Sequence, residues 1–388
     1  MAPLLVIAAL SGFLYAFAPS LENFVYRDAI TASSTEPEQP LEEQIEAAQA
    51  VHPDLQLAAV ESFEDPAKTT RVLFDDPALE SSSYRQAVFV DPGSLEITGD
   101  LVQYGSSRAL PLRTWISEGH RQLWLGDPGR SYSEVAASWL GILALAGGWL
   151  WWAKRKKKRS LHSALGIWLL PGFLFLTVTG LTWSSMAGGN IANLRAELDW
   201  TQPSVNTDEH AHHGHESQAG ELSSQESIDT VAATAREAGL SGIIEFVPPA
   251  EEGAAWTETE MREVWKLSND AIAVDGETGE IVDRVDHADW PLAAKLSAWL
   301  IQLHMGTLFG WINQLVPGVI ALGLLVVILL GYRVWWKRRR TRPGLLAGTI
   351  VFLLAYSVMA PMFGINLVAF LVLDAVIKNV ATRKSKSE

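Results

Sequence analysis

The side chains of this sequence that could do redox or metal chemistry are its histidines, because it contains no cysteine. Without thiols there can be no disulfides, thiolate-held iron–sulfur clusters, c-type haem attachment or cysteine nucleophiles. Any redox chemistry must use histidine-held metal, histidine-held haem or a non-covalent flavin, and no phosphate-cradling glycine loop indicates a flavin. His120, His162 and His304 stand beside apolar stretches. Imidazoles at the edge of a membrane span are costly unless they are paired or bind a ligand, and haem ligation is one such role.

The apolar stretches beside these histidines are long enough to cross a membrane. About 20 apolar residues span a bilayer, which predicts spans at 1–18, 134–153, 160–186 and 312–336. The apolar tail at 344–378 is broken at Ala360-Pro361 and predicts a hairpin of two short spans. We therefore expect an α-helical membrane bundle of about six spans. One long tilted tail helix is the alternative.

The remaining segments, 19–133 and 187–311, are polar and acidic, which explains a net charge of −14 in a chain that is 48% hydrophobic. This acidity argues against nucleic acid as a partner. Residues 40–50 and 227–238 favour helices, and turns at Pro92-Gly93 and Asp275-Gly276 each predict a pair of strands. Each segment is therefore expected to be an α+β module that ends in a short interfacial helix.

Basic clusters predict the orientation of the chain. The runs KRKKKR and KRRRTR follow Trp151-Trp152 and Trp335-Trp336 at the ends of the second and fourth spans. Lys and Arg beside span ends stay in the cytoplasm. Both polar segments would then face outward, into the periplasm of a bacterium with two membranes, and the protein would lie in the inner membrane.

Fixed offsets indicate an internal duplication. The longer of two offsets carries His120 onto His304. It also superposes Asp91 on Asp275 and Trp115 on Trp299. A shorter offset superposes Pro3 on Pro171 and Gly12 on Gly180. Repeated matches of Trp, His and Gly at one offset predict two copies of a unit made of a span, a module and a second span.

The duplication predicts how the histidines pair. His120 and His304 would face each other across the pseudo-symmetry axis and hold one b-type haem at the outer interface. The counterpart of His162 would precede Met1, so we expect the first span to lack its beginning. That missing residue and His162 would hold a second haem at the inner face. The alternative is that these imidazoles only hydrogen-bond to carbonyls or lipid headgroups.

Two further groups of residues are candidates for binding. Gly166, Gly126 and Gly310 lie close to the three histidines and could leave room for haem packing. A histidine-rich tract could bind a transition metal through imidazoles and neighbouring carboxylates, although such tracts are also common as solvated loops. The tract contains His210, His212, His213 and His215.

The sequence resembles the PepSY-associated transmembrane family, which includes iron-regulated membrane proteins of Gram-negative bacteria. The stretches that carry the resemblance are LHSALGIWLLPGFLFLTVTGLTW, GHRQLWLGDPGR and LHMGTLFGWINQ. The segments VFVDPGSLEITG and IAVDGETGEIVD resemble PepSY domains. Some members are inner-membrane ferric-siderophore reductases with b-type haem. The resemblance therefore implies axial-ligand roles for His120, His162 and His304, and the departure from the pattern is the absent histidine of the first span.

These observations predict an inner-membrane oxidoreductase. It would take electrons from a cytoplasmic or quinol donor and reduce a ferric siderophore in the periplasm, because hard oxygen chelators hold Fe(II) less tightly than Fe(III). The acidic modules would suit a cationic chelate or freed iron. Two alternatives remain open at this stage, a siderophore or iron transporter subunit and a PepSY-type binding or regulatory protein without redox activity.

Overall fold

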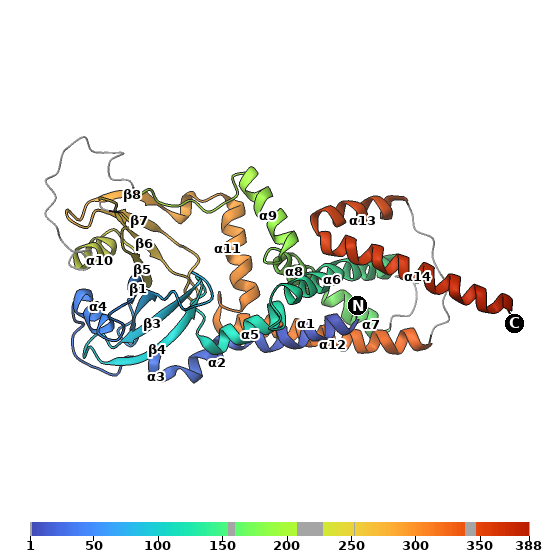
Figure 1. Ribbon diagram of the computed structural model, residues 1–388, viewed down its shortest axis with the longest axis horizontal. Coiled ribbons are helices and arrows are strands. Elements are labelled where there is room, and N and C mark those ends of the chain that lie inside the picture. The colour runs from blue at the N-terminus through green and yellow to red at the C-terminus, as the bar shows by residue number, and fades with distance from the viewer. Residues whose placement is uncertain (1, 154–159, 208–227, 252, 338–346, 388) are drawn as a thin grey trace.

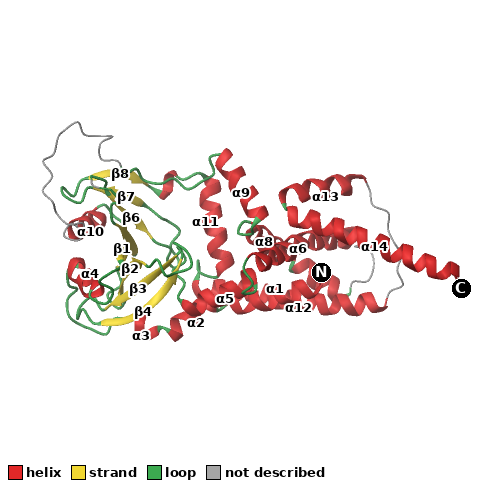
Figure 2. Cartoon of the chain, in the orientation of Figure 1, coloured by secondary structure: helices red, strands yellow, loops and turns green. Residues whose placement is uncertain are grey.

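An antiparallel sheet stands at one end of the molecule and a group of long helices extends from it toward the other end (Figure 1). This computed structural model describes residues 2–153, 160–207, 228–251, 253–337 and 347–387. The chain enters the sheet from the helices twice, and the short helices α5 (Pro111–Gln122) and α11 (Leu292–Met305) lie where the two parts meet (Figure 2).

The two polar segments each supply four strands, which join in one continuous eight-stranded sheet. Its order is β4-β3-β2-β1-β5-β6-β7-β8, and every neighbouring pair is antiparallel. The first segment supplies β1 (Gln56–Phe63), β2 (Thr70–Asp75), β3 (Tyr84–Val90) and β4 (Ile97–Tyr104). The second supplies β5 (Ile243–Val247), β6 (Trp256–Glu260), β7 (Ala271–Val274) and β8 (Ile281–Val285). Pairing of β1 with β5 joins the two segments.

One face of the sheet is covered by α4 (Leu41–Gln49) and α10 (Ile228–Glu237). Alternate strand residues point to this face because side chains in a strand have a period of two. The Asp229 carboxylate accepts a hydrogen bond from the Leu41 amide at 2.7 Å, so α10 satisfies a free donor at the start of α4. The core between the helices and the sheet is built from both segments and includes Ile45, Val60, Val72, Phe74, Val88, Val231, Ile244, Phe246, Trp256 and Ile272.

The two outer hairpins of the sheet turn in the same way. Asp91 donates its amide to the Glu96 carbonyl at 2.9 Å, and Asp275 donates to the Glu280 carbonyl at the same distance. Each aspartate also accepts hydrogen bonds from the amides two and three residues later, which fixes the turn. Burial alone would raise the pKa of Asp91, but four amide donors outweigh it and lower that pKa to about 2.

Among the described residues, two helices are long and apolar enough to cross a membrane, α6 (Asp127–Ala153) and α12 (Gly310–Lys337). Two bent pairs raise the number of candidate spans to as many as four. These are α1 (Ala2–Ala16) with α2 (Ala18–Val25), bent by 45°, and α7 (Leu161–Trp168) with α8 (Leu170–Leu181), bent by 52°. Pro171 explains the second bend, since proline lacks an amide proton and its ring clashes with the carbonyl four residues earlier.

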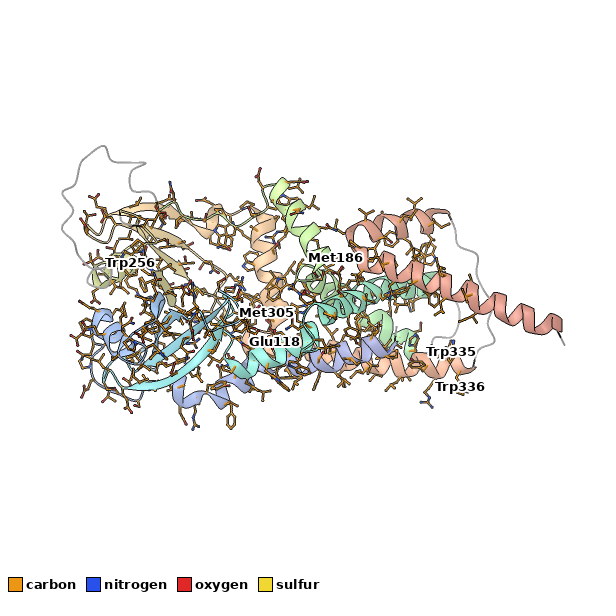
Figure 3. All side chains as sticks on the ribbon, viewed as in Figure 1. Glu118, Met186, Trp256, Met305, Trp335 and Trp336 are labelled. Carbon is orange, nitrogen blue, oxygen red and sulfur yellow. The ribbon has the colours of Figure 1, made fainter. Side chains whose placement is uncertain are left out.

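The helices α13 (Ala347–Met359) and α14 (Pro361–Ser387) follow α12 and pack against each other as a hairpin. The chain turns at Ala360-Pro361, where Gly364 lies close to the Ser357 side chain. Trp335 and Trp336 lie at the end of α12 that is far from the sheet (Figure 3). The described residues also form α3 (Arg27–Ile30), α9 (Met186–Glu197) and the 3-10 turn His287–Asp289.

A buried carboxyl group lies in the sheet core. Glu258 is fully buried, and its register places it between Phe246 of β5 and Ile272 of β7. Neither side-chain oxygen has a hydrogen-bond partner among the described residues. Burial raises the pKa of this carboxyl to about 9, so the group is protonated at neutral pH.

The raised pKa of Glu258 predicts that the stability of the protein depends on pH and that Glu258→Gln removes this dependence. The folded pKa of about 9 lies above the ordinary value of 4.5, so stability is full below the ordinary value and falls as pH rises toward the folded one. The slope is up to about 1.4 kcal/mol per pH unit. Melting temperatures of both proteins in detergent should diverge between about pH 6 and about pH 8.5, with the variant more stable at the higher pH. A difference that does not change with pH would contradict this.

Candidate functional site

His120 and His304 occupy matching places in the structure. His120 is near the end of α5 and His304 is near the end of α11, and a short turn then leads into the long helices α6 and α12. Each short helix ends at a left-handed residue, Leu123 with φ 53° and Gly306 with φ 76°. The chain changes direction there, and the end of each short helix lies close to the start of a long one.

The two imidazoles line one cavity between the helices. The lining is mostly apolar, and most of its residues come from four helices, α1, α6, α8 and α12. The structure therefore brings together His120 and His304, as the longer offset of the repeat predicts. The aliphatic side chains of the lining include Leu5, Ala9, Leu140, Leu176, Ala321 and Leu324.

Hydroxyl groups fix the orientation of both imidazoles. His120 Nδ1 lies 3.0 Å from Ser11 Oγ, and His304 Nδ1 lies 2.6 Å from Thr179 Oγ1. Each hydroxyl also lies within hydrogen-bond distance of the carbonyl one turn earlier in its helix, at 2.9 Å and 2.7 Å. A carbonyl can only accept, so the single hydroxyl proton is used there and Nδ1–H must donate to the hydroxyl oxygen. Nε2 of both rings therefore carries a free lone pair.

His162 has the same protonation pattern but lies elsewhere. It belongs to α7 and does not line the cavity. Its Nδ1 lies 3.0 Å from the Val327 carbonyl oxygen, which again requires Nδ1–H and leaves Nε2 free. His52 differs, because its Nε2 lies 3.0 Å from the Asp100 carboxylate. In the three predicted ligands, Nε2 is the ring nitrogen that is left free. In the ordinary surface histidine His52, Nε2 is bonded.

Burial keeps the two cavity histidines neutral. Both belong to short helices outside the long spans, and burial lowers the pKa of each to about 4. The positive charge that His120 would carry when protonated lowers the pKa of His304 further. A neutral imidazole with a free Nε2 is the form that coordinates a metal ion.

Small residues allow the helices to approach the imidazoles closely. A Cβ atom on Gly12 would lie 3.0 Å from His120 Cε1, so any larger residue at this position of α1 would crowd the imidazole. The Tyr15 ring stacks on His120 with centroids 5.8 Å apart. Sequence reasoning used Gly12 only as a marker of the repeat and missed Ser11 and Thr179. The repeat could have revealed the two hydroxyls, because the shorter offset, which carries Gly12 onto Gly180, also carries Ser11 onto Thr179.

The three predicted packing glycines do not line the cavity. Gly126 and Gly310 have positive φ angles of 64° and 58° and form the turns before α6 and α12. A Cβ on Gly166 would meet no atom within 4 Å, so the helix surface beside His162 is open. Their contact with haem stays a prediction. The histidine-rich tract lies outside the described residues. Among the residues that the structure describes, no group of three or more His, Cys, Asp or Glu could hold a metal ion.

A buried ion pair fixes α5 against α2. The Glu22 carboxylate accepts the Leu110 amide at 2.7 Å and lies 3.3 Å from Arg113 Nε. Both side chains are 8% exposed, so their charges are shielded from water and interact strongly. Because Arg113 is on the same helix as His120, this pair holds the helix that presents the imidazole to the cavity.

Glu22→Ala should therefore destabilise the protein by about 3–5 kcal/mol, since it leaves the Arg113 charge buried without a partner. The double variant with Arg113→Ala removes both charges and should be more stable than the sum of the single losses predicts. Melting temperatures of the four proteins in one detergent test this coupling. Strictly additive losses would show that the two side chains do not act as a pair.

A large antiparallel sheet is joined to apolar helices, and two neutral imidazoles line a cavity between those helices. This arrangement defines a membrane protein with a histidine-lined site. The chain belongs to the family described as PepSY-associated TM region, whose model matches residues 1–338. This match confirms the resemblance seen in the sequence. None of the curated proteins compared matches the chain.

Proposed function

We propose that this protein is an inner-membrane, haem-containing reductase that moves electrons across the membrane, reduces a ferric siderophore in the periplasm and so releases iron. The observation that carries the proposal is the pair His120 and His304. Both imidazoles line the same apolar cavity, and both have Nδ1–H bonded to a hydroxyl and Nε2 free.

The residues of the cavity fit haem b. Metal-ligating imidazoles in proteins donate their other N–H to an oxygen acceptor, as His120 and His304 do. The aliphatic lining suits a flat apolar macrocycle, and a chain without cysteine can hold haem only without covalent attachment. His120 and His304 would be the axial ligands, and the bound haem would supply one-electron redox chemistry.

His162 supports a second haem site, which belongs to the same proposal. Its ring donates to the Val327 carbonyl, the acceptor that many metal-ligating histidines use. The helix surface at Gly166, one turn later, is open. Two sites in one bundle, of which one lies next to the sheet, suit transfer of electrons across a membrane from a cytoplasmic or quinol donor.

The proposal also includes six spans and an internal duplication. The mirrored strand order about β1 and β5 supports the duplication. The site supports it as well, because the shorter offset carries Ser11 onto Thr179 and the longer one carries His120 onto His304, so one hydrogen-bonded pair maps onto the other. The α13–α14 hairpin would add the last two spans. Basic clusters after the second and fourth spans favour a periplasmic sheet.

The sheet offers a place where a polar chelate could bind. A polar cavity opens beside the ends of β3 and β4, on the face of the sheet opposite α4 and α10. Burial raises the pKa of the Glu245 carboxyl in this cavity to about 7, and Arg85 lies 3.7 Å from it. Its other polar side chains are Ser82, Ser83, Gln103 and Ser106.

Removal of either cavity imidazole tests the proposal. Protein purified from haem-replete cells should show the sharp absorption bands of six-coordinate b-type haem after reduction with dithionite. His120→Ala and His304→Ala should each weaken or abolish these bands, because one axial ligand is lost. His52→Ala is the matched control and should keep them, because His52 Nε2 is bonded to Asp100. A colourless wild-type protein would overturn the haem assignment.

The hydroxyl groups should affect haem affinity without touching the iron. Ser11→Ala and Thr179→Ala remove the acceptors of Nδ1–H and should each weaken haem binding about 10–100-fold. Ser11→Thr keeps the hydroxyl and places at this site the residue that the second half of the chain uses. Haem titration of the apoprotein measures the three variants, and equal affinities of wild type, Ser11→Ala and Ser11→Thr would contradict the role.

A further inference from the structure

Positive charge in the cavity is confined to one side. The charged residues that line it are Arg121, Arg130 and Glu134, and the rest of the lining is apolar or neutral. Arg121 belongs to α5, and Arg130 and Glu134 belong to the first two turns of α6. A ligand with an anionic end and an apolar body would therefore meet its counter-charge at the α5–α6 side.

Glu134 does not neutralise these arginines. Its two carboxylate oxygens accept the amides of Met186 and Ala187 at 2.8 Å and 3.2 Å. The positive end of the α9 dipole stabilises a carboxylate in this position. Within the described residues no ion pair joins Glu134 to either arginine.

Both guanidinium groups have unused donors. Arg121 donates one N–H to the Tyr104 hydroxyl at 2.8 Å, and its Nε is shielded from solvent without a hydrogen-bond partner. Arg130 Nε is also shielded from solvent and has no hydrogen-bond partner. Among the described residues, no ion pair involves the Arg130 side chain. A shielded donor without a partner is costly, and an anion bound in the cavity beside the two guanidinium groups would satisfy these donors.

The second half of the chain has neutral residues at the equivalent positions. The longer offset, which relates His120 to His304, places Met305 opposite Arg121 and Gln314 opposite Arg130. Gln314 is already engaged, because its amide oxygen accepts the Ser20 hydroxyl at 2.7 Å. The two imidazoles are therefore equivalent, but the charges around them are not.

We propose that Arg121 and Arg130 bind the two propionate carboxylates of the haem and so fix which edge of the macrocycle faces α5 and the start of α6. This inference rests on the proposed function. Arginine binds carboxylates with short, charge-assisted hydrogen bonds. Because Arg121 also holds Tyr104 at the end of β4, the carboxylate edge would lie on the side of the cavity that leads to the sheet.

A comparison of haem with haem dimethyl ester tests the inference. The ester keeps the macrocycle and the iron but has no carboxylates. The full-length apoprotein in detergent should bind haem about tenfold to a hundredfold more tightly than the ester, the value of charge-assisted hydrogen bonds. In the variant Arg121→Gln/Arg130→Gln this preference should disappear, because affinity for haem falls while affinity for the ester is unchanged.

Tyr104→Phe is the matched control. It removes the hydrogen bond to Arg121 without changing the charge of the cavity, so it should keep the preference for haem. Retained ester binding by the double arginine variant shows that the variant is folded. A wild type that binds both compounds equally, or a preference that persists without the arginines, would overturn the inference and leave the haem site intact. A wild type that binds neither compound would overturn the proposed function together with the inference.

Discussion

The candidate site depends on two hydroxyl groups that have already used their only proton. Ser11 and Thr179 each donate to a carbonyl of their own helix, so each can only accept from the imidazole beside it. This constraint selects one tautomer and leaves Nε2 free on both rings. If the hydroxyls donated to Nδ1 instead, each would place its oxygen beside a carbonyl oxygen without a proton between them, at a cost comparable to a lost hydrogen bond. The backbone of two helices thus controls the chemistry of His120 and His304.

The sheet and the helices bring these rings together. Pairing of β1 with β5 joins two segments that are distant in the sequence, and α5 and α11 emerge from the sheet toward the same group of helices. The ion pair between Glu22 and Arg113 fixes the first of these short helices. The surroundings of the two imidazoles differ in charge, because Arg121 and Arg130 have neutral counterparts in the second half of the chain. In the proposed duplication, one unit used twice would supply two similar ligands, and differences between its copies would supply direction.

The sequence predicts the pairing of His120 with His304 better than it predicts their surroundings. The longer offset of the repeat pairs His120 with His304, because Trp, His and Gly matches at one spacing are rarely accidental. The helices α4 and α10 and the strands next to the turns at Pro92-Gly93 and Asp275-Gly276 also follow from local signals. Strands β1, β2, β5 and β6 do not, since no comparable turn marks them, and the β1–β5 pairing is a contact between distant segments that no local pattern encodes. Ser11 and Thr179 were missed because a hydroxyl in an apolar helix usually bonds only to its own backbone.

The most direct test of this account is electron paramagnetic resonance of the oxidised, haem-loaded, full-length protein. Two neutral imidazoles that bind through Nε2 make ferric haem six-coordinate and low-spin, so the account predicts a low-spin signal with the anisotropy of bis-imidazole ligation. His120→Ala and His304→Ala should each convert this signal to a high-spin one. Absence of the bis-imidazole low-spin signal from the wild-type protein, or its survival after loss of both imidazoles, would contradict the claim that this pair holds the cofactor.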